Sequence, residues 1–163
     1  MKQKHFTATG IVFSSDKEVL MIRHKKLQVW LPPGGHIEEN ELPEDAVLRE
    51  IFEETGVMAE IFSTKQALSL SGKYCRELER PFIVLLEDTE CDGLHIHIDM
   101  IFLCTALCKE LVSQQSEVSD IGWFTLEQFM KLKTFESIVQ TISKAFNYID
   151  RQTGLGNGGT SEV

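Results

Sequence analysis

Cysteine is scarce in this sequence, and its spacing does not indicate a redox or metal-binding pair. The four cysteines are Cys75, Cys91, Cys104 and Cys108, with no C-x-x-C among them, and two of them lie in strongly apolar surroundings. This usage predicts reduced thiols rather than a disulfide framework, as expected for a cytoplasmic protein.

Long apolar runs are also missing. No run approaches the roughly 18 residues that a membrane-spanning helix requires. The first ten residues, MKQKHFTATG, lack the apolar core of a signal peptide. Hydrophobic residues make up 42% of the chain and charged residues 25%, which is typical of a soluble globular protein. We therefore expect a soluble protein that does not bind membranes.

Positive charge is in short supply. Lysine and arginine total 16 against 25 aspartates and glutamates, so the formal net charge is −9. A surface for double-stranded nucleic acid needs a basic footprint, which this composition does not favour. A phosphorylated small molecule is compatible with it, because a bound metal ion reverses the local charge.

The 163 residues are enough for one domain with a real core. No internal repeat and no second domain is visible, so we expect residues 1–153 to form a single domain. Residues 154–163 (GLGNGGTSEV) are glycine-rich and predict a flexible tail.

The most informative stretch is GGHIEENELPEDAVLREIFEETGV, residues 34–57. It fits the pattern G-x5-E-x7-R-E-U-x-E-E-x-G-U, in which U is a bulky aliphatic residue, without a missed position. A chance match at one register has a probability of roughly 10⁻⁹ with average residue usage. The matching residues are Gly35, Glu41, Arg49, Glu50, Ile51, Glu53, Glu54, Gly56 and Val57.

The same stretch predicts a helix from near Pro43 to Thr55. Proline suits the first turn of a helix, and Gly56 suits the left-handed residue that ends one. At about 100° per residue the carboxylates of the motif share one face. The predicted core-facing stripe is separate from them and consists of Leu48, Ile51, Phe52 and Thr55.

The carboxylate face has two interpretations. Glu50 and Glu54 repel each other at i, i+4, and the negative end of the helix disfavours them, although Arg49 can offset Glu53. They form either a solvated acidic face or a site for a divalent cation such as Mg²⁺, which prefers oxygen ligands. The preceding Gly34-Gly35 pair is either an ordinary turn or a backbone that approaches a ligand closely. The complete pattern favours the ligand site in both cases.

This pattern resembles the signature of the Nudix hydrolases. The resemblance implies an α/β protein, an α/β/α sandwich with a mixed parallel and antiparallel sheet. It also implies that water attacks phosphorus and cleaves a phosphoanhydride bond in a nucleoside diphosphate linked to another group. The alternative is a non-catalytic, nucleotide-sensing module on the same fold. Retention of every motif glutamate favours the enzyme, a pyrophosphohydrolase.

The resemblance assigns roles as well. Glu50 and Glu54 are the expected ligands of Mg²⁺, with Mn²⁺ as a substitute, and the backbone carbonyl of Gly34 completes the site. Glu53 is either a further ligand or the catalytic base. Arg49 orients a carboxylate. Glu41 is expected to hydrogen-bond the groups that position the metal ligands without binding the metal itself. A homodimer is compatible with this prediction.

Residues 94–107 (LHIHIDMIFLCTAL) predict a strand that enters the interior. His95, His97 and Asp99 alternate with apolar residues and therefore share one face. This face is a transition-metal site, the lining of a substrate cleft, or a solvated surface. Nudix relatives carry a similar His and Asp before an apolar strand, which favours the substrate cleft.

The remaining elements follow from local patterns. Thr125 predicts a cap for a short helix at residues 126–128, and a longer helix is expected at residues 135–149. Two residue groups outside these elements are also of interest. The basic patch His24-Lys25-Lys26 is either a solvated loop or a phosphate contact. Tyr74 resembles a tyrosine of dinucleoside polyphosphate hydrolases. Further strands are expected at residues 6–13, 18–23, 58–70 and 81–86, and within 116–125.

Overall fold

The structure is a computed structural model that describes residues 2–62, 74–88, 95–112 and 118–152. One mixed sheet of eight strands forms its centre, with the order β3-β2-β1-β7-β5 and with β4, β6 and β8 pairing β1, β7 and β2. β1 runs parallel to β7 along the whole of β1, and every other pair is antiparallel. The strands are β1 (Gln3–Phe13), β2 (Val19–His24), β3 (Trp30–Leu31), β4 (Gly34–His36), β5 (Ala59–Ile61), β6 (Ile83–Glu87), β7 (His95–Ala106) and β8 (Val118–Phe124).

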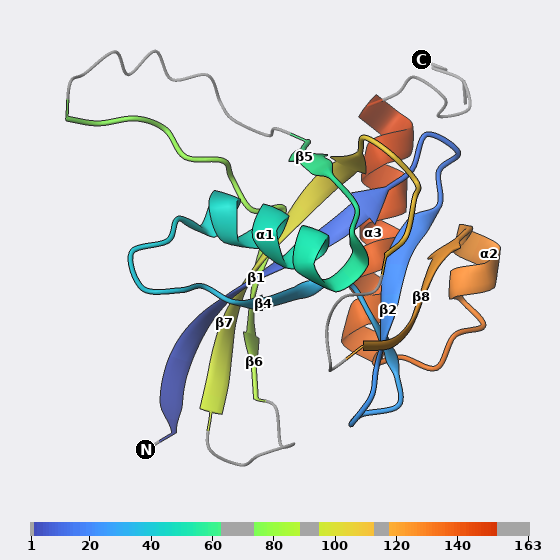
Figure 1. Ribbon diagram of the computed structural model, residues 1–163, viewed down its shortest axis with the longest axis horizontal. Coiled ribbons are helices and arrows are strands. Elements are labelled where there is room, and N and C mark those ends of the chain that lie inside the picture. Colours follow the sequence, from blue (N-terminus) through green and yellow to red (C-terminus); the bar gives the residue numbers. More distant parts are fainter. Residues whose placement is uncertain (1, 63–73, 89–94, 113–117, 153–163) are drawn as a thin grey trace, which may run out of the picture.

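The two long helices, α1 (Pro43–Thr55) and α3 (Glu136–Gln152), pack on opposite faces of this sheet (Figure 1). Successive side chains of a strand point to opposite faces, and β1 shows this clearly. Ile11 and Phe13 join the core beneath α3, whereas Ala8 and Val12 join the core beneath α1. The α/β/α sandwich with a mixed sheet predicted from the sequence is therefore confirmed.

α1 has the predicted bounds. Pro43 occupies its first turn, and Gly56 ends it in the left-handed conformation (φ 72°), with its N–H donating to the Phe52 carbonyl. The predicted core stripe is wrong at Phe52, whose side chain is 46% exposed. The reason is a close approach to β1: a Cβ on Gly10 would lie 2.6 Å from the Ile51 side chain. The helix face centred on Ile51 therefore meets the sheet, and Phe52 is turned away.

The other helices also follow their sequence signals. α2 (Leu126–Phe129) begins at a capping box in which Thr125 and Gln128 each accept a hydrogen bond from the other's backbone N–H. α3 buries Ile142, Ala145 and Phe146 against the sheet. Of the strand predicted at residues 58–70, β5 is the part that the structure describes as strand, and residues 63–70 lie outside the described ranges.

Two further predictions fall partly or wholly outside those ranges. The predicted tail, residues 154–163, and Cys91 are not described. Cys75, Cys104 and Cys108 are free thiols, and burial raises the pKa of Cys104 to about 12. In the part of the chain that the structure covers, no helix has the length and apolarity needed to cross a membrane.

Candidate active site

The candidate site forms where β4 passes the second half of α1. The Gly34 N–H donates a hydrogen bond to a Glu54 carboxylate oxygen at 2.9 Å. A Cβ on Gly35 would lie 2.5 Å from Glu50 Oε1, so only glycine leaves room for that carboxylate. Glu50 and Glu54 are 9% and 6% exposed. A fully solvated acidic face is therefore wrong, because two of the three carboxylates are buried against a glycine strand.

Arg49 holds the remaining charges together. Its guanidinium donates to both Glu41 oxygens at 2.8 and 2.9 Å, to Glu50 at 2.8 Å and to Glu53 at 3.2 Å. It also donates to the His36 carbonyl at 3.0 Å. The hydrogen bonds from Arg49 hold the pKa of Glu41 below its usual value, and its acidic partners raise the pKa of Arg49. The predicted Arg49–Glu53 pair is confirmed, and Arg49 contacts two more carboxylates than the helix spacing suggested.

Oxygen donors dominate this cluster, which suits a hard divalent cation such as Mg²⁺. Their arrangement in the protein alone is set by Arg49, which draws Glu50 and Glu53 toward itself. Within the described ranges, no group of three or more His, Cys, Asp or Glu side chains is already arranged to hold a metal ion. The donor chemistry fits a cation. Glu50 and Glu53 accept hydrogen bonds from Arg49, whereas Glu54 accepts one from the Gly34 N–H.

Four of the chain's five histidines gather on the sheet beside this cluster. Their ring centroids are 4.5 Å apart for His5 and His95, 5.3 Å for His5 and His36, and 5.0 Å for His36 and His97. The parallel register pairs His5 with His97, and β4 brings in His36. Sequence reasoning found His95 and His97 but missed the other two, because neither lies near them in the chain.

Asp99 has a different environment from the two histidines predicted with it. It is buried, and the hydroxyls of Thr7 and Thr9 donate to one of its carboxylate oxygens at 2.9 and 3.0 Å. Burial raises its pKa, although the two threonines and His97 act in the opposite direction. Burial also raises the pKa of Glu87, and the nearby charge of Asp99 adds to that effect. A solvated face is therefore wrong for Asp99.

β4 connects the two groups of side chains. Its Gly34 backbone packs against Thr9, since a Cβ there would lie 2.7 Å from the Thr9 hydroxyl. Its His36 contacts Arg49 through the carbonyl and His97 through the ring. The acidic face of α1 and the histidine face of β7 thus belong to one continuous region. From the sequence alone they are two separate predictions.

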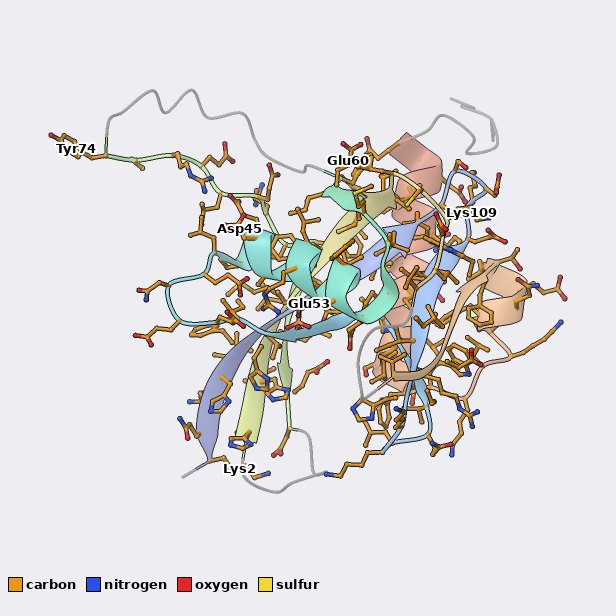
Figure 2. All side chains as sticks on the ribbon, viewed as in Figure 1. Lys2, Asp45, Glu53, Glu60, Tyr74 and Lys109 are labelled. Carbon is orange, nitrogen blue, oxygen red and sulfur yellow. The ribbon has the colours of Figure 1, made fainter. Side chains whose placement is uncertain are left out.

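Tyr74 and the basic patch do not join this region directly. Tyr74 is 90% exposed and lies far from Glu53, which sits where α1 passes β4 (Figure 2). The basic patch forms the turn between β2 and β3, where His24 accepts a hydrogen bond from the Leu27 N–H at 3.2 Å.

Comparison with known proteins identifies the family. A model of the NUDIX domain matches residues 3–146. The chain belongs to the Nudix family. A crystal structure of a Nudix-family hydrolase from Clostridium perfringens superimposes with a TM-score of 0.77 at 29% identity, covering 89% of this chain and 97% of that one. The family match, residues 3–146, includes the glycine strand β4 and the acidic helix α1.

Two further relatives are more distant or only partly covered. A probable DHNTP pyrophosphohydrolase from Lactococcus lactis is 31% identical over 121 residues, which are 74% of this Nudix chain and 63% of that protein. The chain therefore matches less than two thirds of that relative's length. The Ap4A hydrolase of C. elegans has a TM-score of 0.67 at 17% identity, covering 90% of this chain and 98% of that one, and it shows the shared fold.

Proposed function

We propose that this Nudix protein is a metal-dependent pyrophosphohydrolase that acts on a nucleotide derivative. The observation that carries the proposal is the burial of Glu50 and Glu54 against the Gly34-Gly35 backbone. Two buried carboxylates on one helix face are costly unless a partner neutralises them. Arg49 forms an ion pair with Glu50. A divalent cation would neutralise both buried carboxylates and bind phosphate oxygens on its other side, and Arg49 would then serve Glu41 and Glu53.

Glu50, Glu54 and the Gly34 carbonyl are the groups that would hold the cation. Gly34 pairs with Thr9 in the ladder, but its N–H donates to Glu54 instead of to β1. The N–H and C=O of a strand residue point to the same side, so the Gly34 carbonyl is also directed away from β1. When bound, Mg²⁺ or Mn²⁺ supplies positive charge to the phosphate oxygens and makes water a better nucleophile.

Glu53 and Arg49 have separate proposed roles in catalysis. The Glu53 side chain is 46% exposed, so it is accessible to water and suits either the base or a further metal ligand. Arg49 contacts Glu41, Glu50 and Glu53 at once and acts by fixing their orientation. Charge neutralisation and positioning are the main requirements for phosphoryl transfer.

The substrate face is proposed to be the β7 surface beside β4. His95 and His97 extend the site from Arg49 and His36 along the sheet. Asp99 is buried beneath this face, where it accepts hydrogen bonds from Thr7 and Thr9. It is proposed to contribute to substrate binding by fixing these two hydroxyls. A small phosphorylated molecule, a nucleotide derivative, fits these groups better than a nucleic acid duplex does, because the chain carries a net charge of −9.

The second candidate is a nucleotide-sensing module without turnover. The buried Glu50 and Glu54 favour the enzyme, because a binding module has no need to bury a pair of repelling carboxylates. The cytoplasm is the proposed location, in agreement with free thiols at Cys75, Cys104 and Cys108. A homodimer stays a prediction.

The deciding experiment is a substrate screen with purified protein and Mg²⁺, reading phosphate and pyrophosphate. The panel holds nucleoside triphosphates, oxidised dNTPs, DHNTP, nucleotide sugars, ADP-ribose and dinucleoside polyphosphates. We expect EDTA to abolish turnover and Glu54→Gln to lower kcat by at least about 100-fold, as when a key electrostatic group is removed. Glu60→Gln, outside the motif, is the matched control and should keep wild-type activity.

His97→Ala belongs in the same screen, where it should change KM or the order of preferred substrates. Full turnover after exhaustive chelation would overturn the metal-dependent mechanism. Binding of a panel member without turnover of any of them would favour the sensing module.

A further inference from the structure

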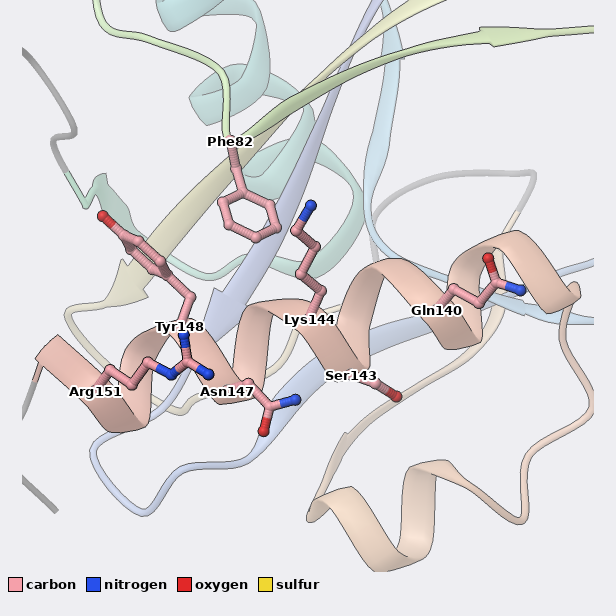
Figure 3. A pocket seen from close by; sticks show the side chains of 7 residues that line it. All are labelled: Phe82, Gln140, Ser143, Lys144, Asn147, Tyr148 and Arg151. Atoms are coloured by element: carbon pink, nitrogen blue, oxygen red, sulfur yellow. The ribbon is translucent and has the colours of Figure 1, made fainter. Parts of the chain in front are cut away.

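A second candidate binding site lies on the opposite side of the sheet from α1. One face of α3 and the residue before β6 line a pocket of about 450 Å³ (Figure 3). This size lies within the range of roughly 300–1,000 Å³ that is usual for small-molecule sites. Its lining residues are Phe82, Gln140, Ser143, Lys144, Asn147, Tyr148 and Arg151.

The pocket is distinct from the proposed catalytic region. It shares no residue with the glutamates of α1 or with the four-histidine group. The helix that lines it packs on the other sheet face, through Ile142, Ala145 and Phe146. No acidic residue is among its lining side chains, so a phosphate placed there needs no metal ion to offset carboxylate repulsion.

Its charge is unusual for this protein. Lys144 and Arg151 are exposed, and neither forms an ion pair or hydrogen bond with any residue in the described ranges. Many other cations of the chain are paired with carboxylates, as Lys17 is with Asp150 and Lys131 with Glu127. In a chain of net charge −9, two cations left on one helix face attract an anion.

Aromatic rings lie between the two cations. Tyr148 is four residues after Lys144 and three before Arg151, so all three share one helix face. The Phe82 and Tyr148 rings are 5.5 Å apart and tilted by 57°, and the Lys144 side chain extends alongside Phe82 (Figure 3). Lys144 and Arg151 start about 10.5 Å apart along the helix axis, which two long side chains can span to reach one phosphate.

We propose that this pocket binds a nucleoside monophosphate independently of the catalytic site. The planar base stacks on one ring of the tilted Tyr148–Phe82 pair and meets the other ring at its edge, and Lys144 and Arg151 reach the phosphate from their two positions on the helix. Base–aromatic stacking accepts any base, and Ser143 and Asn147, which also line the pocket, supply polar groups. The class of ligand follows from these rings together with two cations that have no partner among the described residues.

The test is an NMR titration of the isotope-labelled full chain with AMP in EDTA, with adenosine and ribose 5-phosphate as partial ligands. We expect AMP to shift resonances of α3 and Phe82. AMP should bind at least about fivefold more tightly than either partial ligand, since each lacks one of the two interactions. The double variant Lys144→Gln/Arg151→Gln should weaken AMP binding by at least about tenfold.

Two control variants test whether AMP binds in the α3 pocket and not elsewhere. Lys131→Gln removes a cation whose side chain is 71% exposed and which lies outside the pocket, and it should bind AMP as the wild type does. Glu54→Gln should also leave AMP binding in EDTA unchanged, whatever it does to catalysis. No shift of α3 resonances at millimolar AMP overturns the proposal. In a parallel titration with Mg²⁺ in place of EDTA, AMP-induced shifts confined to α1 also overturn it, and they leave the proposed catalytic site intact.

Discussion

Arg49 is the residue through which most of the acidic charge of the site is balanced. It contacts Glu41, Glu50 and Glu53 at 2.8–3.2 Å and the His36 carbonyl at 3.0 Å. The carboxylates therefore repel one another less in the protein alone than the helix spacing by itself suggests. Each guanidinium contact is a charge-assisted hydrogen bond, and a planar guanidinium can serve several acids at once.

Replacing Arg49 should destabilise the metal-free protein. Arg49→Gln leaves three neighbouring carboxylates without their cation, so we expect the free energy of unfolding to fall by on the order of 1–3 kcal/mol. Urea unfolding in EDTA measures this change. Arg49→Lys should recover part of the loss, because one ammonium cannot reproduce the fork of donors.

The matched comparison for Arg49 is Lys131→Gln, which removes an exposed cation from a pair with Glu127. Such pairs contribute about 0–1 kcal/mol, so its unfolding should stay close to wild type. Equal effects of the two substitutions would mean that the Arg49 network is no more stabilising than a surface pair.

Asp99 should give the protein a measurable pH dependence. Burial raises its pKa in the folded protein above the ordinary value of 3.8. The stabilising contribution of such a group is complete below its unfolded pKa and is lost as the pH rises through the folded pKa. Wild type should therefore lose stability relative to Asp99→Asn as the pH rises from about 4 toward neutrality.

Urea unfolding of both proteins at several pH values across this window measures the effect. Taking the difference between the two proteins cancels the carboxylates that they share, although Glu87 responds to the charge of Asp99 and belongs to the same titration. A difference that is constant with pH would show that Asp99 titrates as an ordinary exposed carboxyl.

The contact between β4 and α1 is the element-scale feature that makes the site. A Cβ on Gly35 would meet the Glu50 carboxylate carbon at 2.6 Å, so Gly35→Ala must displace Glu50. We expect this substitution to reduce kcat by at least about tenfold while the protein stays folded, because misplacing a catalytic group by about 1 Å is enough to cost that much. Turnover of the best substrate and circular dichroism measure the two effects.

Gly122→Ala is the control for the added methyl group. Gly122 lies in β8, and a Cβ there would meet the Phe124 ring at 2.8 Å. Both variants therefore crowd a side chain, but only Gly35 touches a carboxylate of the motif. A parallel loss of activity in the two variants would point to general destabilisation instead of a displaced Glu50.

Local signals were sufficient for the helices and insufficient for β4. Pro43, Gly56 and Thr125 mark helix ends through their own backbone chemistry, so those bounds could be read from the sequence. Residues Gly34–His36 resembled a turn because glycine disfavours strands. They form a strand through pairing with Thr7–Thr9, a contact between distant parts of the chain.

The burial of the carboxylates could not be predicted for the same reason. Helix spacing places Glu50 and Glu54 on one face, but only the packing of β4 decides that this face is covered. Likewise, nothing local to His5 or His36 indicates that they meet His95 and His97. The parallel register of β1 and β7 brings His5 to them, and the pairing of β4 with β1 brings His36. The motif thus predicted the family and the chemistry, and the sheet determined the rest of the site.

At the scale of the whole molecule, metal binding should raise the free energy of unfolding. The wild type gains RT ln(1 + [Mg²⁺]/Kd) on binding, about 1.4 kcal/mol at ten times Kd. Glu50→Gln and Glu54→Gln should gain less, because each removes a proposed oxygen ligand. Glu60→Gln, which lies in β5 outside the motif, should respond as the wild type does. The measurement is thermal unfolding of the four proteins with and without millimolar Mg²⁺ at fixed ionic strength.

The metal-free melting temperatures carry separate information about the same carboxylates. Neutralising Glu54 removes like-charge repulsion within α1 but weakens the acceptor of the Gly34 N–H, whereas neutralising Glu50 weakens a contact with Arg49. Because these effects oppose each other, the metal-free change should be small in both variants, and the Mg²⁺-induced shift is the quantity to compare. An identical shift in wild type and both variants would mean that these carboxylates do not bind metal in the free protein. Repeating the titration with a non-hydrolysable nucleotide analogue then separates a cation that arrives with the phosphate from one that does not bind here at all.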